Sequence, residues 1–124
     1  MPICPIRGQP QPDCYTLLMS QIHPPQFAVI YRWRLAAGKE DQFRAAWERV
    51  TVALLAHRGA LGSRLHRTDD GTWLAYAQWP DRDSWQRSRD AEPIDPESLE
   101  QMRDAVEESF EPILLQPVAD HLKR

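Results

Sequence analysis

The sequence of 124 residues is poor in several residue types that carry common chemistry. It has five glycines, two cysteines, two lysines and no asparagine. It contains no glycine-rich phosphate loop, no dinucleotide fingerprint and no Gly-x-Ser-x-Gly nucleophile motif. Cys4 and Cys14 have nine residues between them, which is not a zinc-binding spacing, and the four histidines are scattered. We therefore expect free thiols, no metal, and no NAD, FAD or ATP as a fixed cofactor.

Charge and hydropathy argue against two broad classes of protein. The net charge is −3, whereas general nucleic-acid binders carry a basic surplus. No run of 18 apolar residues is present that would cross a membrane. The first residues also lack the basic start and apolar stretch of a secretory signal. We expect a cytoplasmic protein that binds neither nucleic acid nor membranes.

Proline divides the chain into two unequal parts. Residues 1–26 hold six of the eleven prolines, and such a segment forms no helix and builds little core. We predict an N-terminal arm over 1–26 and a single domain over 27–124. Met19 is an alternative start of translation; otherwise the arm crosses a partner subunit.

Hydrophobic periodicity predicts the elements of that domain. Residues 27–35 alternate as a strand, and Phe43, Trp47, Val50 and Leu54 recur at helical spacing. Gly59 is the expected C-terminal cap of this helix. The predicted elements are a strand at 27–35, a helix at 39–57, a hairpin at 60–79, a helical region from Pro80, a longer helix at 97–110 and a strand at 113–122.

The hairpin decides which side chains share a face. Asp69-Asp70-Gly71 suits a three-residue loop, with Gly71 taking a positive φ, and this places Thr68 opposite Thr72. One face then carries Gly62, Arg64, His66, Leu74, Tyr76 and Gln78, and the other carries Leu61, Ser63, Leu65, Trp73, Ala75, Ala77 and Trp79. A two-residue loop would instead move Trp73 and Trp79 to the face of His66 and Arg64.

The order βαββαβ predicts a ferredoxin-like α+β fold with a four-stranded antiparallel sheet and helices on one face only. The second face would leave Ile30, Leu74 and Tyr76 exposed together. Contiguous apolar patches of this kind mark partner surfaces. We therefore expect a homodimer in which the two sheets face each other.

Residues 27–122 resemble the antibiotic-biosynthesis-monooxygenase-like family of dimeric α+β barrels. The similarity lies in the strand and exit VIYRWRLAAGKEDQF at 29–43, in Gly59-Ala-Leu-Gly62, and in a hairpin that ends in Gln78-Trp79 before a helix. Members share a frame and differ in chemistry.

The resemblance includes a haem-degrading branch, whose site is built from a strand Asn, a Trp and a helical His. The sequence contains no Asn and has no His between Trp79 and Phe110, so haem degradation of that type is not expected.

The cofactor-free branch of the family implies a monooxygenase acting on a small electron-rich aromatic such as a phenol, anthrone or quinol. Resemblance to that branch points to strand residues of the Trp, Tyr, His and Arg types. We expect His66 and Tyr76 to be catalytic, because an imidazole changes charge near neutral pH and a phenol can hold a substrate oxygen. The expected substrate-binding residues are Arg32, Arg34, Arg64, Gln78 and Trp73.

Each of these residues also has a structural explanation. His66 and Tyr76 fit a dimer interface, the arginines fit ion pairs across it, and Trp73 and Trp79 fit the core. Two other functions suit the same frame: a lyase, cyclase or isomerase that uses His66 for proton transfer, and a non-catalytic dimeric module that binds a small ligand or stabilises a partner. A cavity of a few hundred cubic ångströms favours a ligand over a solid interior.

Overall fold

The structure is a computed structural model and describes residues 27–123. The predicted arm and Met19 lie outside the described residues. The elements, in chain order, are β1 (Phe27–Leu35), α2 (Glu40–His57), β2 (Gly62–Arg67), β3 (Trp73–Trp79), α3 (Arg82–Asp90), α4 (Pro96–Ala105), β4 (Val106–Ser109) and β5 (Ile113–Leu115). The predicted first strand and first helix are confirmed to within one residue.

The strands form one antiparallel sheet in the order β2-β3-β1-β4, with β5 also paired to β1. β4 pairs with the end of β1 at Trp33–Leu35, and β5 pairs with its beginning at Ala28–Ile30. The fourth row of the sheet is thus shared by two short strands, which makes five strands where four were expected. The predicted α+β, ferredoxin-like arrangement is confirmed.

The last long helix ends earlier than the sequence predicts. α4 stops at Ala105, and the next four residues form β4 instead of continuing to Phe110. Tertiary pairing overrides the helical spacing: the Ala36 amide donates to the Ala105 carbonyl at 2.8 Å, and Glu108 pairs with Arg34 on β1. The expectation that Phe110 lies on a helix face is wrong, because Phe110 follows a strand and donates its amide hydrogen to the Arg32 carbonyl at 3.1 Å.

The final strand is also shorter than the predicted 113–122. Only Ile113–Leu115 forms β5, and Leu115 pairs with Ala28. The next pairing partner along β1 would be Phe27, where the strand begins. Pro117 has no amide hydrogen to continue a ladder.

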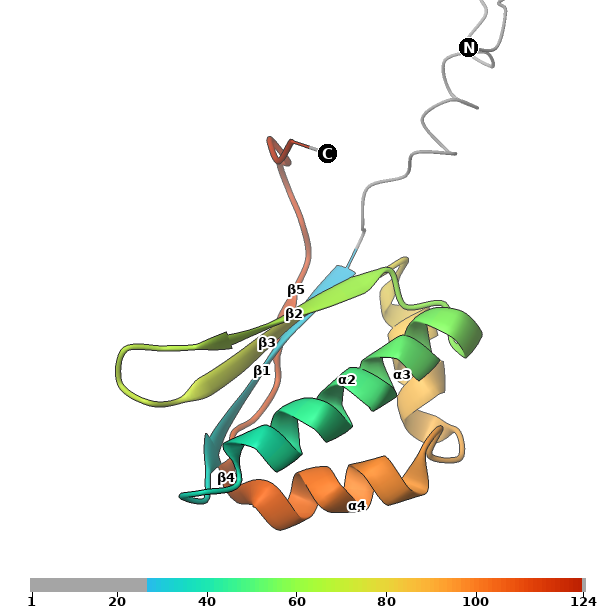
Figure 1. Cartoon of the computed structure of the whole chain (residues 1–124). Helices are drawn as coiled ribbons and strands as arrows, with labels where there is room; N and C mark the ends of the chain where they lie inside the picture. The colour runs from blue at the N-terminus through green and yellow to red at the C-terminus, as the bar shows by residue number, and fades with distance from the viewer. Residues whose placement is uncertain (1–26, 124) are drawn as a thin grey trace, which may run out of the picture.

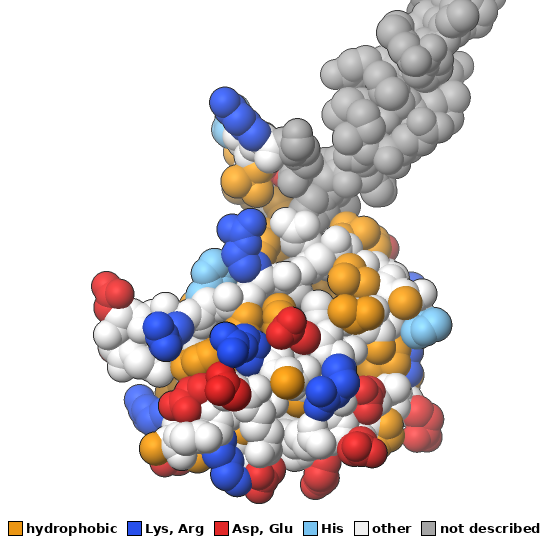
Figure 2. Space-filling model, in the orientation of Figure 1, with side chains coloured by type: hydrophobic (Ala, Val, Ile, Leu, Met, Phe, Trp, Pro, Cys, Tyr) orange, Lys and Arg blue, Asp and Glu red, His pale blue; other side chains and the backbone are white. Residues whose placement is uncertain are grey.

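Helices α2, α3 and α4 lie on one side of the sheet, with α2 and α4 side by side (Figure 1). The core between these layers is centred on a cluster of Phe27, Val29, Ala77, Trp79 and Trp85, and Phe43 of α2 is fully buried. Charges of both signs are mixed over the surface of α2 and α4 (Figure 2). Within 27–123 no helix is long and apolar enough to cross a membrane.

The hairpin has the predicted three-residue loop. Arg67 pairs with Trp73, and Arg64 pairs with Tyr76. Gly71 has a φ of +89°, which L-residues with a side chain rarely adopt. The register prediction is therefore confirmed: Trp73 and Trp79 are on the helix-facing side, and His66 and Tyr76 are on the open side.

Candidate active site

An apolar cavity of about 220 Å³ lies between the sheet and helices α2 and α4, and we call it the aromatic cavity. Four aromatic side chains line it: Tyr31, Trp33, Trp47 and Trp79. The remaining lining residues are Val50, Thr51, Leu54, Leu55, Ala60, Gly62, Ser63, Ala77, Leu99 and Met102. An apolar cavity of about 150 Å³ holds benzene, so this space accepts a small aromatic molecule.

Two sequence patterns build the walls of this cavity. Alternation along β1 turns Tyr31 and Trp33 toward the helices, on the same side as the fully buried Val29. The stripe of α2 turns Trp47 and Leu54 back toward the sheet. Tyr31 and Trp33 stack with ring centroids 6.0 Å apart and planes 15° apart. The cavity is therefore a continuation of the core in which side chains do not fill the space.

The polar side chains that line the aromatic cavity carry hydroxyl or indole N–H groups, and no charged side chain lines it. The hydroxyls belong to Tyr31, Thr51 and Ser63. Tyr31 is fixed by a neighbour outside the lining: the Nε1 of Trp85 donates to its hydroxyl oxygen at 2.7 Å. Because an indole only donates, the phenol hydrogen of Tyr31 stays available to a different acceptor. The site can therefore hold an uncharged ring and donate a hydrogen bond to an oxygen on it.

The sequence-predicted residues on β2 and β3 come together on the open side of the sheet. Arg64, His66, Tyr76 and Gln78 line one groove of about 590 Å³, together with Gly62, Ser63, Leu122 and Lys123. His66 and Arg64 are exposed, whereas Tyr76 and Gln78 are half-buried. The groove lies on the open side of the sheet, and it shares Gly62 and Ser63 of β2 with the aromatic cavity on the other side.

Arg32 and Arg34 lie on the same face but on β1, and both pack on Phe110. Their guanidinium carbons are 5.1 Å and 5.8 Å from the centre of its ring. Arg34 is also paired with Glu108. The buried Nε of Arg32 has no hydrogen-bond partner among the described residues. The structure thus separates these two arginines from the groove that holds His66.

Trp73 is on the helix-facing side, where its ring meets the edge of Phe43 with centroids 6.2 Å apart. It lines an open groove beside α2 and not the aromatic cavity. Among the described residues, no three His, Cys, Asp or Glu side chains gather as a metal site.

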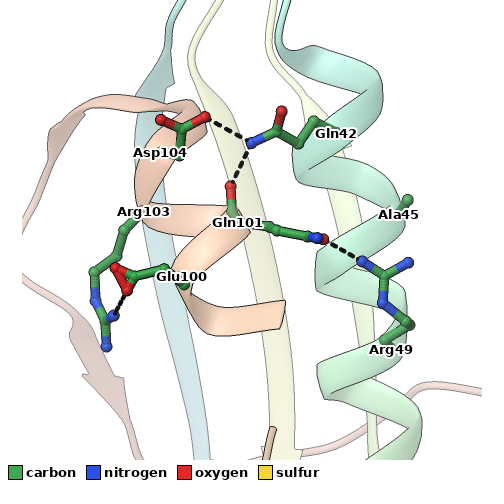
Figure 3. A pocket seen from close by; sticks show the side chains of 7 residues that line it. All are labelled: Gln42, Ala45, Arg49, Glu100, Gln101, Arg103 and Asp104. Carbon is green, nitrogen blue, oxygen red and sulfur yellow. Dashed lines mark hydrogen bonds and ion pairs between the residues drawn. The ribbon is translucent and has the colours of Figure 1, made fainter. Parts of the chain in front are cut away.

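A third groove, of about 870 Å³, runs along the seam between α2 and α4 (Figure 3). Its polar side chains bond to one another. Gln42 donates to the Gln101 carbonyl at 2.9 Å and to Asp104 at 3.0 Å, and Arg49 donates to the Ser98 hydroxyl at 2.9 Å. These contacts hold the two helices together, and they leave this surface without an evident reactive group.

Carboxyl groups with lowered pKa values lie at helix ends and in the hairpin loop. The bond from Lys39, followed by that from Gln42, lowers the pKa of Asp104. The backbone amide of Ser84 is the main cause of the lowered pKa of Asp81, which caps the start of α3. These carboxylates stabilise local structure, and neither lines the aromatic cavity.

A family model described as antibiotic biosynthesis monooxygenase matches residues 26–108, more than half of the chain. The chain belongs to the antibiotic biosynthesis monooxygenase family. The resemblance inferred from the strand and hairpin motifs is thereby confirmed. No protein of curated function matches the chain.

Several solved structures share the fold at low sequence identity. SnoaB from Streptomyces nogalater, a cofactor-independent oxygenase, has a TM-score of 0.65 and 17% identity, covering 78% of this chain and 97% of its own. Rv0793 from Mycobacterium tuberculosis has a TM-score of 0.63 and 18% identity, and the match covers 76% of this chain and 96% of Rv0793. NE2512 from Nitrosomonas europaea, of unknown function, has a TM-score of 0.64 and 13% identity, and the match covers 82% of this chain and 98% of NE2512.

Sequence reasoning for this family member missed the aromatic cavity as a site. Alternation places Tyr31 and Trp33 on a strand, and helical spacing places Trp47 on a helix stripe, but neither pattern indicates an unfilled space between them. The available signal was an excess of large aromatic rings on the helix-facing side of β1 and β3, opposite small residues such as Ala75 and Ala77. Large rings opposite small residues can leave space, but only packing in three dimensions shows where.

Proposed function

We propose that the protein is a cofactor-independent monooxygenase whose substrate is a small, uncharged, electron-rich aromatic bound in the aromatic cavity. The observation that carries this proposal is the composition of that cavity. Four aromatic rings surround a space lined by no charged side chain, and a fixed phenol provides a hydrogen-bond donor. Apolar walls with few polar groups are typical of small-molecule sites. Membership of the family and the likeness to SnoaB support oxygenation as the reaction.

An anthrone illustrates the proposed reaction. Its ring CH₂ loses a proton to water, and the resulting anion passes one electron to O₂. The two radicals combine to a peroxide, which takes up a proton and then loses water to leave the quinone. One oxygen atom enters the product and the other leaves as water. All four electrons come from the substrate, so the balance requires no added reductant.

The contribution of the chain is to stabilise the substrate anion. Negative charge develops on the ring oxygen, and we assign the Tyr31 hydroxyl, whose hydrogen is not used in its bond with Trp85, as the donor that binds it. The apolar rings of Trp33, Trp47 and Trp79 lower the local dielectric around the substrate ring, which strengthens that hydrogen bond. No basic side chain lines the cavity, so the proton leaves to water.

The open-side groove is the second candidate site. The observation in its favour is that Arg64, His66, Tyr76 and Gln78 line it together. In this groove His66 would act as the base and Tyr76 would hold a substrate oxygen. Arg32, Arg34 and Trp73 do not line the groove. They would bind the substrate only if their side chains moved or if a partner subunit completed the site. The same groove suits a lyase or isomerase using His66. A non-catalytic ligand-binding module is the remaining alternative.

We also propose that the protein is a homodimer that buries the open side of the sheet. That side combines half-buried Ile30, Leu74 and Tyr76 with exposed Ile113, which is 40% exposed in the single chain. Apolar side chains on one continuous face favour burial against a second copy. A cytoplasmic location stays a prediction from the sequence.

Oxygen uptake tests the proposed function. The purified protein is mixed with anthrone or a simple hydroquinone in an oxygen electrode, and ¹⁸O₂ labelling of the anthraquinone formed from anthrone is measured. We expect one O₂ consumed per anthrone and one labelled atom in the quinone, at a rate above the uncatalysed reaction. Ala60→Leu, which adds bulk at a residue that lines the cavity and not the open-side groove, should abolish the rate enhancement with an unchanged circular dichroism spectrum. A full rate in this variant, or no enhancement by the parent protein, would reject the proposal.

A further inference from the structure

Trp85 is the residue that holds the Tyr31 hydroxyl, although it does not line the aromatic cavity. It comes from α3, far along the chain from β1, and is only 5% exposed. Its Nε1 donates to the Tyr31 hydroxyl oxygen at 2.7 Å, a normal length for such a bond. Because this bond occupies the phenol as an acceptor, the hydrogen of the phenol must point elsewhere.

The indole of Trp85 is itself held on two sides. The ring of Phe27 lies 5.5 Å from it, and the Arg89 guanidinium lies 5.0 Å from its centre. The helix that carries it is anchored at both ends. Asp81 accepts from the Ser84 amide at 2.7 Å at the start, and Arg58 donates to the Glu92 carbonyl at 2.7 Å just beyond the end. The donor is thus fixed before any ligand binds.

We propose that Trp85 is a positioning residue that directs the Tyr31 hydrogen into the aromatic cavity, onto the oxygen of an uncharged phenol or anthrone. This inference rests on the proposed function. A hydroxyl that already accepts a bond donates a stronger one, since bonds in a chain polarise each other. A donor oriented in advance also needs no rearrangement when charge develops on the substrate. Ring packing alone would not need the indole N–H.

Trp85→Phe separates the positioning role from ring packing, because it keeps a buried aromatic ring and removes the indole N–H donor. We expect kcat for anthrone oxidation to fall about tenfold with KM changed less than twofold, a smaller loss than the ~10²-fold of removing the direct donor. The double variant Tyr31→Phe/Trp85→Phe should be no slower than Tyr31→Phe, because Trp85 acts only through the phenol. Gln86→Ala, an exposed change on the same helix, is the matched control. A purely structural role would raise KM or unfold the protein, with losses that add to those of Tyr31→Phe.

A spectroscopic measurement tests the inference without turnover. The Trp85 indole N–H signal is assigned by its loss in Trp85→Phe, and 1,8-dihydroxyanthrone is added under argon. We expect this signal to shift on binding in the parent protein and to stay unchanged in Tyr31→Phe, which binds the same probe. Binding without a shift, or additive kinetic losses, would overturn the positioning role. A shift of the signal without oxygen uptake would reject the proposed monooxygenase activity and support the positioning role of Trp85. If the probe does not bind at all, both proposals are overturned.

Discussion

Thr68 and Thr72 face each other across the β2–β3 loop, with the amide nitrogen of Thr68 2.8 Å from the carbonyl oxygen of Thr72. The Thr68 hydroxyl oxygen lies 3.0 Å from the same carbonyl oxygen and also contacts the Asp70 carboxylate. This pair closes the loop and fixes the register of the whole hairpin. It thereby determines that Tyr76 and His66 lie on one side of the sheet and Trp79 on the other.

Gly71→Ala should destabilise the protein through the backbone alone. The φ of Gly71 is +89°, and an added Cβ would meet no heavy atom within 4 Å. The expected loss is about 1 kcal/mol in the free energy of unfolding, the usual cost of a left-handed conformation. Urea unfolding measures it, with Gly71→Asn as a milder control because Asn tolerates this region. An unchanged midpoint for Gly71→Ala would contradict the loop geometry.

Acid should weaken the hairpin through Asp70. Hydrogen bonds from the Thr68 hydroxyl and then from the Thr72 amide lower the pKa of Asp70 from 3.8 to about 2. A carboxyl with a lowered folded pKa stabilises the fold above its unfolded pKa, and this stabilisation is lost as pH falls toward the folded pKa. Stability of the parent protein should thus decline between about pH 4 and 2 more steeply than that of Asp70→Ala. The free energy of unfolding is measured by chemical unfolding at several pH values. The same dependence on pH in the parent protein and in Asp70→Ala would contradict this prediction.

Loop chemistry is local, and for this reason the register of the hairpin could be predicted from Asp69-Asp70-Gly71. The end of α4 could not be predicted in this way. Its helical spacing continues to Phe110, but pairing of Glu108 with Arg34 on β1 extends the chain after Ala105. A contact between residues more than 70 positions apart leaves no local signal.

Arg58→Met should loosen α3. Arg58 follows α2 and donates to the carbonyls of Ser88 and Glu92 at 3.3 Å and 2.7 Å. Since the contacts are partly exposed, their loss should cost about 1–2 kcal/mol of unfolding free energy. Arg87→Met, which loses only a 3.3 Å contact to Ser84 within its own helix, should cost less than about 0.5 kcal/mol. Equal effects in thermal or urea unfolding would show that Arg58 does not anchor α3.

The dimer proposal predicts a clear change in mass. Leu74→Asp places a charge on the open side of the sheet and should give a monomer in sedimentation velocity at micromolar concentration. Val52→Asp changes a residue that is 64% exposed on α2, and this variant should remain dimeric. A monomeric parent protein would refute the dimer, and a dimeric Leu74→Asp would place the interface elsewhere.

The candidate site was only partly accessible to sequence reasoning. Faces could be assigned from alternation, so the grouping of Arg64, His66 and Tyr76 on one side was predicted correctly. The size of the aromatic cavity depends on the distance between α2 and β1. The orientation of the Tyr31 hydroxyl depends on its hydrogen bond with Trp85, which is 54 residues away in the sequence. Residue type suggests His66 as the reactive group, whereas the aromatic cavity lies on the opposite side of the sheet.

Initial rates of anthrone-dependent oxygen uptake for Tyr31→Phe and His66→Ala, each compared with the parent protein, test the central claim most directly. If the aromatic cavity is the active site, Tyr31→Phe should lower kcat about 10²-fold, the usual cost of losing a donor to a developing oxyanion. His66→Ala should then change the rate less than threefold, because its side chain is on the far side of the sheet. A silent Tyr31→Phe together with an inactive, folded His66→Ala would contradict the account and place the chemistry in the open-side groove.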